Sequence, residues 1–154
     1  MSYPLWVKDA SDVQALVVRA QAQTVPAENS DSVLGLEFNQ VGYEQLLTDA
    51  KIDLGEEKMK GFADFDVLMP CCGFDHTFAN LPDNCQCGHH LASYGVIKKM
   101  LLAGMPRQQI QLEANRWINY FFPKEAVAKE LKSSSLSPNN LNAALKYLNT
   151  KGGC

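Results

Sequence analysis

Apolar side chains return every three or four residues in several separate segments of the chain, which is the spacing of one face of an α-helix. One stripe joins Leu91, Tyr94, Ile97 and Leu101. Helices are therefore predicted over residues 9–24, 43–50, 56–65, 88–102, 106–121 and 123–131, and a last helix is predicted from 138 to the end of the apolar pattern near 148.

Proline, glycine and small polar residues mark the ends of these predicted helices. Pro123 stands where a first helical turn accepts proline, and Ser137 before Pro138 has the pattern of an N-cap followed by N1. Gly104 is expected to end its helix in the left-handed conformation. The polar, irregular stretch 27–40 is expected to pack as a loop.

The predicted fold class is all-α, a small single-domain helical bundle spanning residues 1–154 with an irregular Cys/His-rich loop and a flexible tail at 151–154. The 154 residues are 46% hydrophobic, which is enough for a core that does not depend on a metal. A net charge of -3 and the lack of a Lys/Arg cluster argue against nucleic-acid binding. No apolar run has the length of a membrane span.

All three histidines and four of the five cysteines lie between residues 71 and 90. A hydrophobic core does not require such a concentration of thiols and imidazoles. These groups are the preferred donors for Zn(II) and Cu(I), whereas carboxylates and carbonyls suit Mg and Ca. The sequence therefore predicts a metal site whose candidate ligands are Cys71, Cys72, His76, Cys85, Cys87 and His90.

Cys85 and Cys87 come just before the helix predicted from Gly88. Exposed amide groups at a helix N-terminus stabilise thiolates, so these thiols would be good ligands or good nucleophiles. Residues three apart share a helix face, which favours His90 over His89 as a companion of Cys87. His89 is expected to face solvent or to support a ligand.

Adjacent Cys71 and Cys72 differ from the Cys-x-x-Cys spacing of structural zinc sites. The pair fits one ligand per ion, a bridging role in a small Cu(I) cluster, or a vicinal dithiol. Met69 and Met100 would add thioether donors of the kind that Cu(I) accepts. Copper(I) is therefore the favoured ion, and zinc is second.

Each remaining polar side chain of the motif is compatible with two roles. His76 is equally compatible with a ligand role and with a hydrogen bond to Asp75 in a turn. Asp75 and Asp83 would orient an imidazole beside a metal, or serve as turn residues. By contrast, the aromatic residues 117 and 120–122 lie at helical spacing and are expected in the core.

Other cofactors fit the spacing less well. Covalent haem requires Cys-x-x-Cys-His, and the stretch from Cys85 to His89 has one residue too few between its cysteines. A Rieske centre requires two Cys/His pairs, and an ordinary [2Fe-2S] cluster would leave the histidines unused. Neither a P-loop nor a hydrolase triad motif is present.

Residues 67–73 read Val-Leu-Met-Pro-Cys-Cys-Gly, and Cys85-Gln86-Cys87 then opens a helical region that continues through Met100 and Gly104. Over about residues 64–121 this resembles the bacterial lipoproteins with a Pro-Cys-Tyr-Cys-Gly-Cys motif, although the chain has Pro-Cys-Cys-Gly. That resemblance implies a small extracytoplasmic protein that binds metal. The helix-Gly-helix pattern after the cysteines is also similar to the thiol oxidoreductases of cytochrome c maturation.

The leading functional hypothesis is a metal-binding protein for storage, sensing or delivery, with the ion and a metal-accepting protein as its partners. The alternative is a thiol-disulfide oxidoreductase that uses Cys85 and Cys87, or Cys71 and Cys72, as its redox dithiol. A third hypothesis is an interaction domain held together by disulfides, which would bind no metal.

Overall fold

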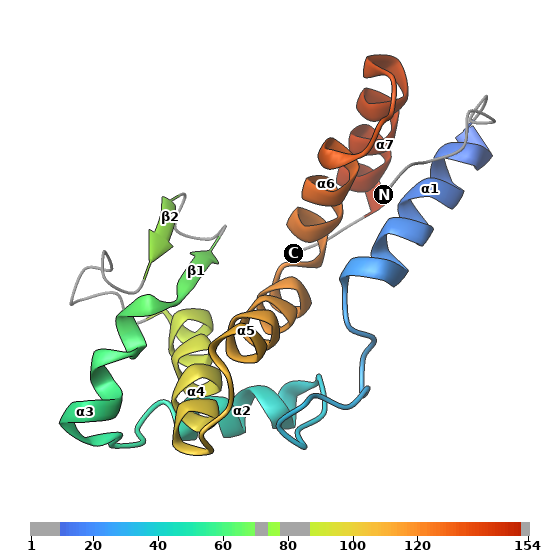
Figure 1. Ribbon diagram of the computed structural model, residues 1–154. Helices are drawn as coiled ribbons and strands as arrows, with labels where there is room; N and C mark the ends of the chain where they lie inside the picture. The colour runs from blue at the N-terminus through green and yellow to red at the C-terminus, as the bar shows by residue number, and fades with distance from the viewer. Residues whose placement is uncertain (1–9, 70–73, 78–86, 152–154) are drawn as a thin grey trace. The chain divides into compact units, whose positions relative to one another are not determined.

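The computed structural model describes residues 10–69, 74–77 and 87–151 and is mainly helical (Figure 1). The predicted all-α class is confirmed. Within the described residues, no helix combines the length and apolarity that a membrane crossing requires. The elements in chain order are α1 (Ala10–Thr24), α2 (Gln40–Asp49), α3 (Gly55–Lys60), the 3-10 helix η1 (Phe62–Asp64), β1 (Asp66–Met69), β2 (Phe74–Thr77), α4 (Gly88–Leu102), α5 (Arg107–Phe121), α6 (Pro123–Ser133) and α7 (Pro138–Lys151).

The chain forms two compact units. Unit 1 contains residues 1–26 and 122–154, and unit 2 contains residues 27–121, so the second unit is inserted between α1 and α6. Every candidate metal ligand predicted from the sequence belongs to unit 2. The expected single domain stays a prediction.

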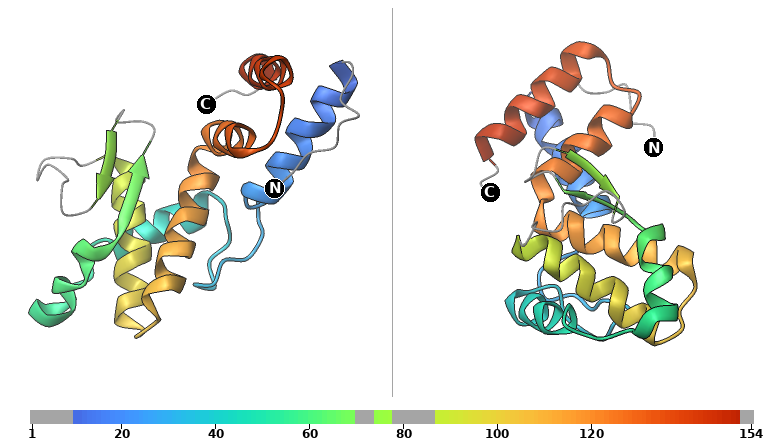
Figure 2. Two further views of the ribbon diagram at one scale, coloured as in Figure 1. Left: turned by 45° about the horizontal axis from the view of Figure 1, so that its top comes forward. Right: turned by 90° about the vertical axis from the view of Figure 1, so that its left-hand side faces the viewer.

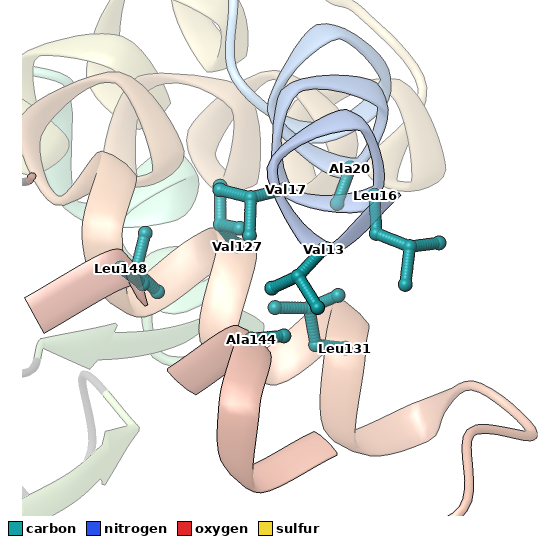
Figure 3. Packing of buried hydrophobic residues seen from close by; sticks show 8 residues of the cluster. All are labelled: Val13, Leu16, Val17, Ala20, Val127, Leu131, Ala144 and Leu148. Carbon is teal, nitrogen blue, oxygen red and sulfur yellow. The ribbon is translucent and has the colours of Figure 1, made fainter. Parts of the chain in front are cut away.

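Unit 1 has a core of aliphatic side chains from α1, α6 and α7, which pack on one another (Figure 3). Pro123 is at the start of α6 as predicted, and the Ser137 hydroxyl accepts a hydrogen bond of 3.3 Å from the Asn140 amide at the start of α7. The apolar pattern and the signals at the helix ends therefore placed these helices correctly. The core residues are Val13, Leu16, Val17, Ala20, Val127, Leu131, Ala144 and Leu148.

Unit 2 is built around α4, which packs against both α2 and α5. The helices α4 and α5 lie side by side (Figure 2) and are joined by a short turn in which Gly104 has a φ of 72°, as predicted. The Met105 amide bonds to the Met100 carbonyl at 3.1 Å and closes the end of α4. This arrangement buries α4 on several sides.

Because α4 is buried on several sides, the sequence predicted the wrong buried face for this helix. The predicted stripe of Leu91, Tyr94, Ile97 and Leu101 is only half-buried apart from Ile97. The fully buried positions include Ala92, Val96 and Met100 instead. Apolar residues occur around most of this helix, so periodicity alone could not identify the face that α2 and α5 cover.

The hairpin of β1 and β2 was not predicted from the sequence. The two strands are antiparallel, and Val67 pairs with His76 while Met69 pairs with Phe74. Part of the expected irregular Cys/His loop is therefore strand.

The predicted helix over 56–65 ends early, at Lys60, because Gly61 caps α3 through bonds to the Lys58 and Met59 carbonyls.

The apolar pattern around the predicted helix 56–65 also predicts that Met59 and Val67 point inward. Met59 is instead 40% exposed. Val67 is fully buried as expected, but from a strand that contacts α4 and α5. The backbone pairing of β1 with β2 decides this arrangement. Such pairing joins residues across a turn, and the short apolar run of 65–69 did not reveal it.

Candidate metal centre

Cys87 and His90 are the two predicted ligands that the structure describes at the start of α4. Cys87 is the N-cap residue, with φ -60° and ψ 138°, and its carbonyl accepts a 3.0 Å hydrogen bond from the Leu91 amide. Cys87 is half-buried and His90 is fully buried. The helix begins at Gly88, so the two candidate ligands are the N-cap residue and the third residue of its first turn.

The hairpin carries the other described candidate, His76. Its backbone lies in β2 opposite Val67 of β1, and β1 in turn contacts α4. Cys71, Cys72 and Cys85 lie outside the described residues, as does Asp83. The four residues 70–73 connect the paired positions Met69 and Phe74.

Met100 does not join this centre. It is fully buried in the core of unit 2, ten residues along α4 from His90. At 1.5 Å per residue these positions are about 15 Å apart along the helix axis. A donor at that distance cannot share an ion with the first turn, so the suggested Met100 thioether is wrong.

His89 is half-buried and packs against two aromatic rings, and its two expected roles stay predictions. Its ring stacks on Phe121 with centroids 4.9 Å apart and an interplanar angle of 30°, and its centroid is 5.9 Å from that of Tyr43. Tyr43 and Phe121 meet edge to face at 5.6 Å. Burial disfavours the charged imidazolium and lowers the pKa of His89.

Of the aromatic residues predicted in the core, Trp117 and Phe122 are buried, whereas Tyr120 and Phe121 are half-buried. Trp117 is fully buried, with its ring centroid 4.4 Å from that of Phe38. Tyr120 donates a 2.8 Å hydrogen bond to the carboxylate of Glu28. Burial and this carboxylate raise the pKa of Tyr120 to about 12. These contacts fasten the loop before α2 onto α5.

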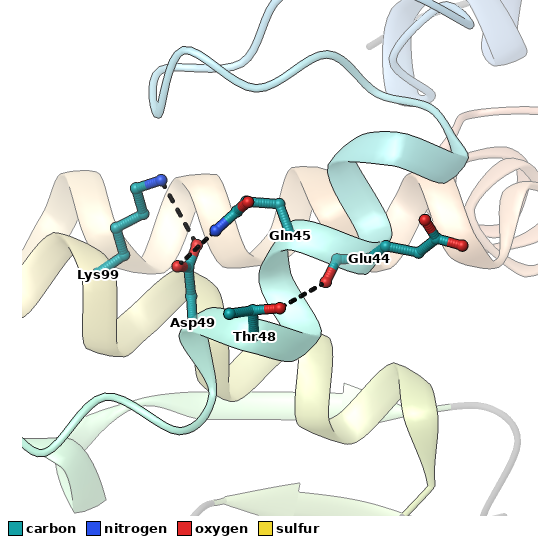
Figure 4. A network of polar contacts seen from close by, with 5 residues as sticks. All are labelled: Glu44, Gln45, Thr48, Asp49 and Lys99. Atoms are coloured by element: carbon teal, nitrogen blue, oxygen red, sulfur yellow. Dashed lines mark hydrogen bonds and ion pairs between the residues drawn. The ribbon is translucent and has the colours of Figure 1, made fainter.

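A polar network joins the end of α2 to α4 (Figure 4). Asp49 is only 8% exposed, accepts a 3.1 Å hydrogen bond from the Gln45 side chain, and forms an ion pair of 3.4 Å with Lys99. Lys98 donates a 2.8 Å bond to the carbonyl of Ala50 at the C-cap of α2. Lys99 is nine residues from His90, about 14 Å along the helix, so this network is separate from the candidate centre.

Among the described residues, no three His, Cys, Asp or Glu side chains lie close enough to hold a metal ion together. Comparisons with protein-family models, curated proteins and solved structures give no match. The resemblance to the lipoproteins therefore stays an expectation. Metal binding has to be argued from the ligand chemistry of this chain.

Sequence reasoning missed Tyr43 and Phe121 as neighbours of the motif. Each has an ordinary position on the apolar face of its own helix, and neither is near residue 89 in the sequence. One signal was present at Gly88. A Cβ at that position would overlap the Tyr43 hydroxyl, so a larger residue there would displace the Tyr43 side chain.

Proposed function

We propose that the protein binds a soft or borderline metal ion through its Cys/His cluster, with Cu(I) favoured and Zn(II) second. The proposed ligands are drawn from Cys71, Cys72, His76, Cys85, Cys87 and His90. Adjacent thiols and several imidazoles suit the low coordination number and soft character of Cu(I). The role is storage, sensing or delivery of the ion, and delivery implies a metal-accepting partner protein.

One structural observation carries the proposal. The hairpin that brackets Cys71 and Cys72, and the helix that begins after Cys87, belong to the same compact unit, and β1 contacts α4 directly. Met69 and Phe74 are paired, and four residues separate them in the sequence. The two halves of the motif are thus attached to elements that touch.

Charge also favours a cation in this unit. In residues 27–121, acidic residues outnumber basic ones, although the whole chain has a net charge of only -3. An excess of negative charge raises the local concentration of cations and speeds their association. The effect supports capture of a metal ion without distinguishing copper from zinc.

The test is anaerobic purification of the untagged protein, followed by metal analysis by mass spectrometry and titration of free thiols. Bound copper or zinc near stoichiometry, with thiols released only by chelation or denaturation, would support the proposal. A Cys154→Ser variant is the matched control, because Cys154 lies outside the cluster and its loss should leave the metal content unchanged. A metal-free protein whose metal-titrated thiols remain unprotected would contradict the proposal.

The position of Cys87 favours a second candidate function, thiol-disulfide exchange. Cys87 is the N-cap of a 15-residue helix, and a second cysteine, Cys85, stands two residues before it in the sequence. A metal site should lose affinity gradually when single cysteines are replaced, whereas turnover should be abolished when the attacking thiol becomes serine. Single Cys→Ser variants assayed for both properties separate the two functions.

A further inference from the structure

We propose that His89 is a positioning residue whose ring, held by Tyr43 and Phe121, fixes the first turn of α4 and thereby the placement of Cys87 and His90. This inference rests on the proposed metal-binding function and specifies what supports that site. The three side chains at 43, 89 and 121 are called the ring triad below. Its members come from three different helices of unit 2.

The contacts of the ring triad bear directly on the segment between the two candidate ligands. Phe121 of α5 stacks on the His89 ring with the two ring centroids 4.9 Å apart, and the ring centroid of Tyr43 in α2 lies 5.9 Å from that of His89. The Tyr43 hydroxyl also occupies the space where a side chain at Gly88 would begin. Two consecutive residues, 88 and 89, are therefore held from outside α4.

The first turn of a helix needs such support, because its leading amides have no partners within the helix and helix ends fray. At α4 the first regular bond runs from the Leu91 amide to the Cys87 carbonyl, at 3.0 Å. Loss of this turn would separate Cys87 from His90. Metal ligands tolerate little displacement, and residues that orient them affect affinity without touching the ion.

Stacking and ligation make different demands on position 89. Stacking uses the faces of the ring, which a phenyl group reproduces, whereas ligation requires a ring nitrogen, which phenyl lacks. His89→Phe should therefore bind metal as the wild-type chain does. His89→Leu fills the site without an aromatic face, and His89→Ala empties it, so both should weaken binding.

The experiment measures the affinity of the full chain for Zn(II) and for Cu(I) by competitive titration. The wild-type chain, the three His89 variants and His90→Gln are compared. We expect affinities near the wild-type value for His89→Phe and about 10-fold weaker binding for His89→Ala, the scale of a lost supporting residue. Amide hydrogen exchange of the metal-free chain is the second readout. The Leu91 amide should exchange faster in His89→Ala and at the wild-type rate in His89→Phe. If His89→Ala does not fold, His89→Leu takes its place in both measurements.

Equal loss of affinity in His89→Phe and His89→Ala, with unchanged exchange at Leu91, would make His89 a ligand and overturn the inference. Unchanged affinity and exchange in every His89 variant would also overturn it. If the wild-type chain binds neither ion, the proposed function fails, and hydrogen exchange alone decides whether the ring triad holds the turn. Faster exchange of Leu91 in His89→Ala but not in His89→Phe would then still support the structural role.

Discussion

Replacing Gly95 with alanine should destabilise unit 2, although alanine is the better helix former. Gly95 lies in α4 where α2 crosses it, and it is fully enclosed. A Cβ at this position would overlap the Leu46 carbonyl oxygen and lie 2.9 Å from the carbonyl carbon and 3.2 Å from the Ala50 amide nitrogen. These neighbours are backbone atoms, so α2 itself has to move.

The magnitude follows from two opposing effects. Alanine in a helix interior is favoured over glycine by about 1 kcal/mol, while inserting a group into a close-packed contact costs about 1–3 kcal/mol, with more where backbone must shift. Moving α2 would also stretch the ion pair between Asp49 and Lys99. Because backbone has to shift here, the packing cost is taken at the upper end of that range, and we expect a net loss of about 2 kcal/mol in the free energy of unfolding, or about 4–8 °C in Tm for a chain of this size.

Urea unfolding followed by tryptophan fluorescence measures this loss. The chain has two tryptophans, and a Trp6→Phe background leaves Trp117, which is buried in unit 2, as the reporter. Gly61→Ala is the matched control, because its Cβ would meet nothing nearer than the Lys58 carbonyl at 3.7 Å. A Gly95→Ala chain as stable as wild type or more so would refute the close contact between α2 and α4.

Three further predictions concern other parts of the chain. Leu131→Ala, which removes a fully buried side chain of unit 1, should lower the free energy of unfolding by about 2–5 kcal/mol, measured by circular dichroism; no loss would contradict the packing of α1, α6 and α7. The pKa of His89 in the folded chain lies below the ordinary histidine value of 6.5, so the contribution of His89 to stability is complete above pH 6.5 and falls as the pH drops toward the folded pKa. That acid-dependent loss should be smaller in His89→Phe, and equal pH profiles would argue against burial of the imidazole. The phenol absorbance of Tyr120 should titrate near pH 12, and Glu28→Gln should lower this pKa without restoring its ordinary value, because burial is the larger cause.

The ends of several helices could be read from local sequence. Gly104 adopts the expected positive φ, Pro123 and Pro138 begin helices, and the Ser137 hydroxyl bonds near the start of α7. These signals act through the backbone conformation of one or two residues, so they hold whatever the rest of the chain does. α2 begins earlier than predicted, because the Asn39 side chain accepts a 2.9 Å bond from the Gly42 amide.

Some features of the candidate site could likewise be predicted from local sequence, whereas others depended on the folded structure. The choice of thiols and imidazoles, and the spacing of Cys87 and His90 on one helical turn, are properties of a short stretch of sequence. The exclusion of Met100 needed the helix that separates it from His90. The position of His76 opposite Val67 needed the pairing of two strands.

By itself the sequence determined that the chain is mainly helical, where most helices stop, and which donor atoms the motif offers. Tertiary structure decided which side of α4 is buried, that Met59 is exposed, and that His89 lies against Tyr43 and Phe121. The physical reason is range. Backbone preference and side-chain chemistry belong to each residue and its nearest neighbours, whereas burial and contact depend on residues that are distant in sequence and meet only when the chain has folded.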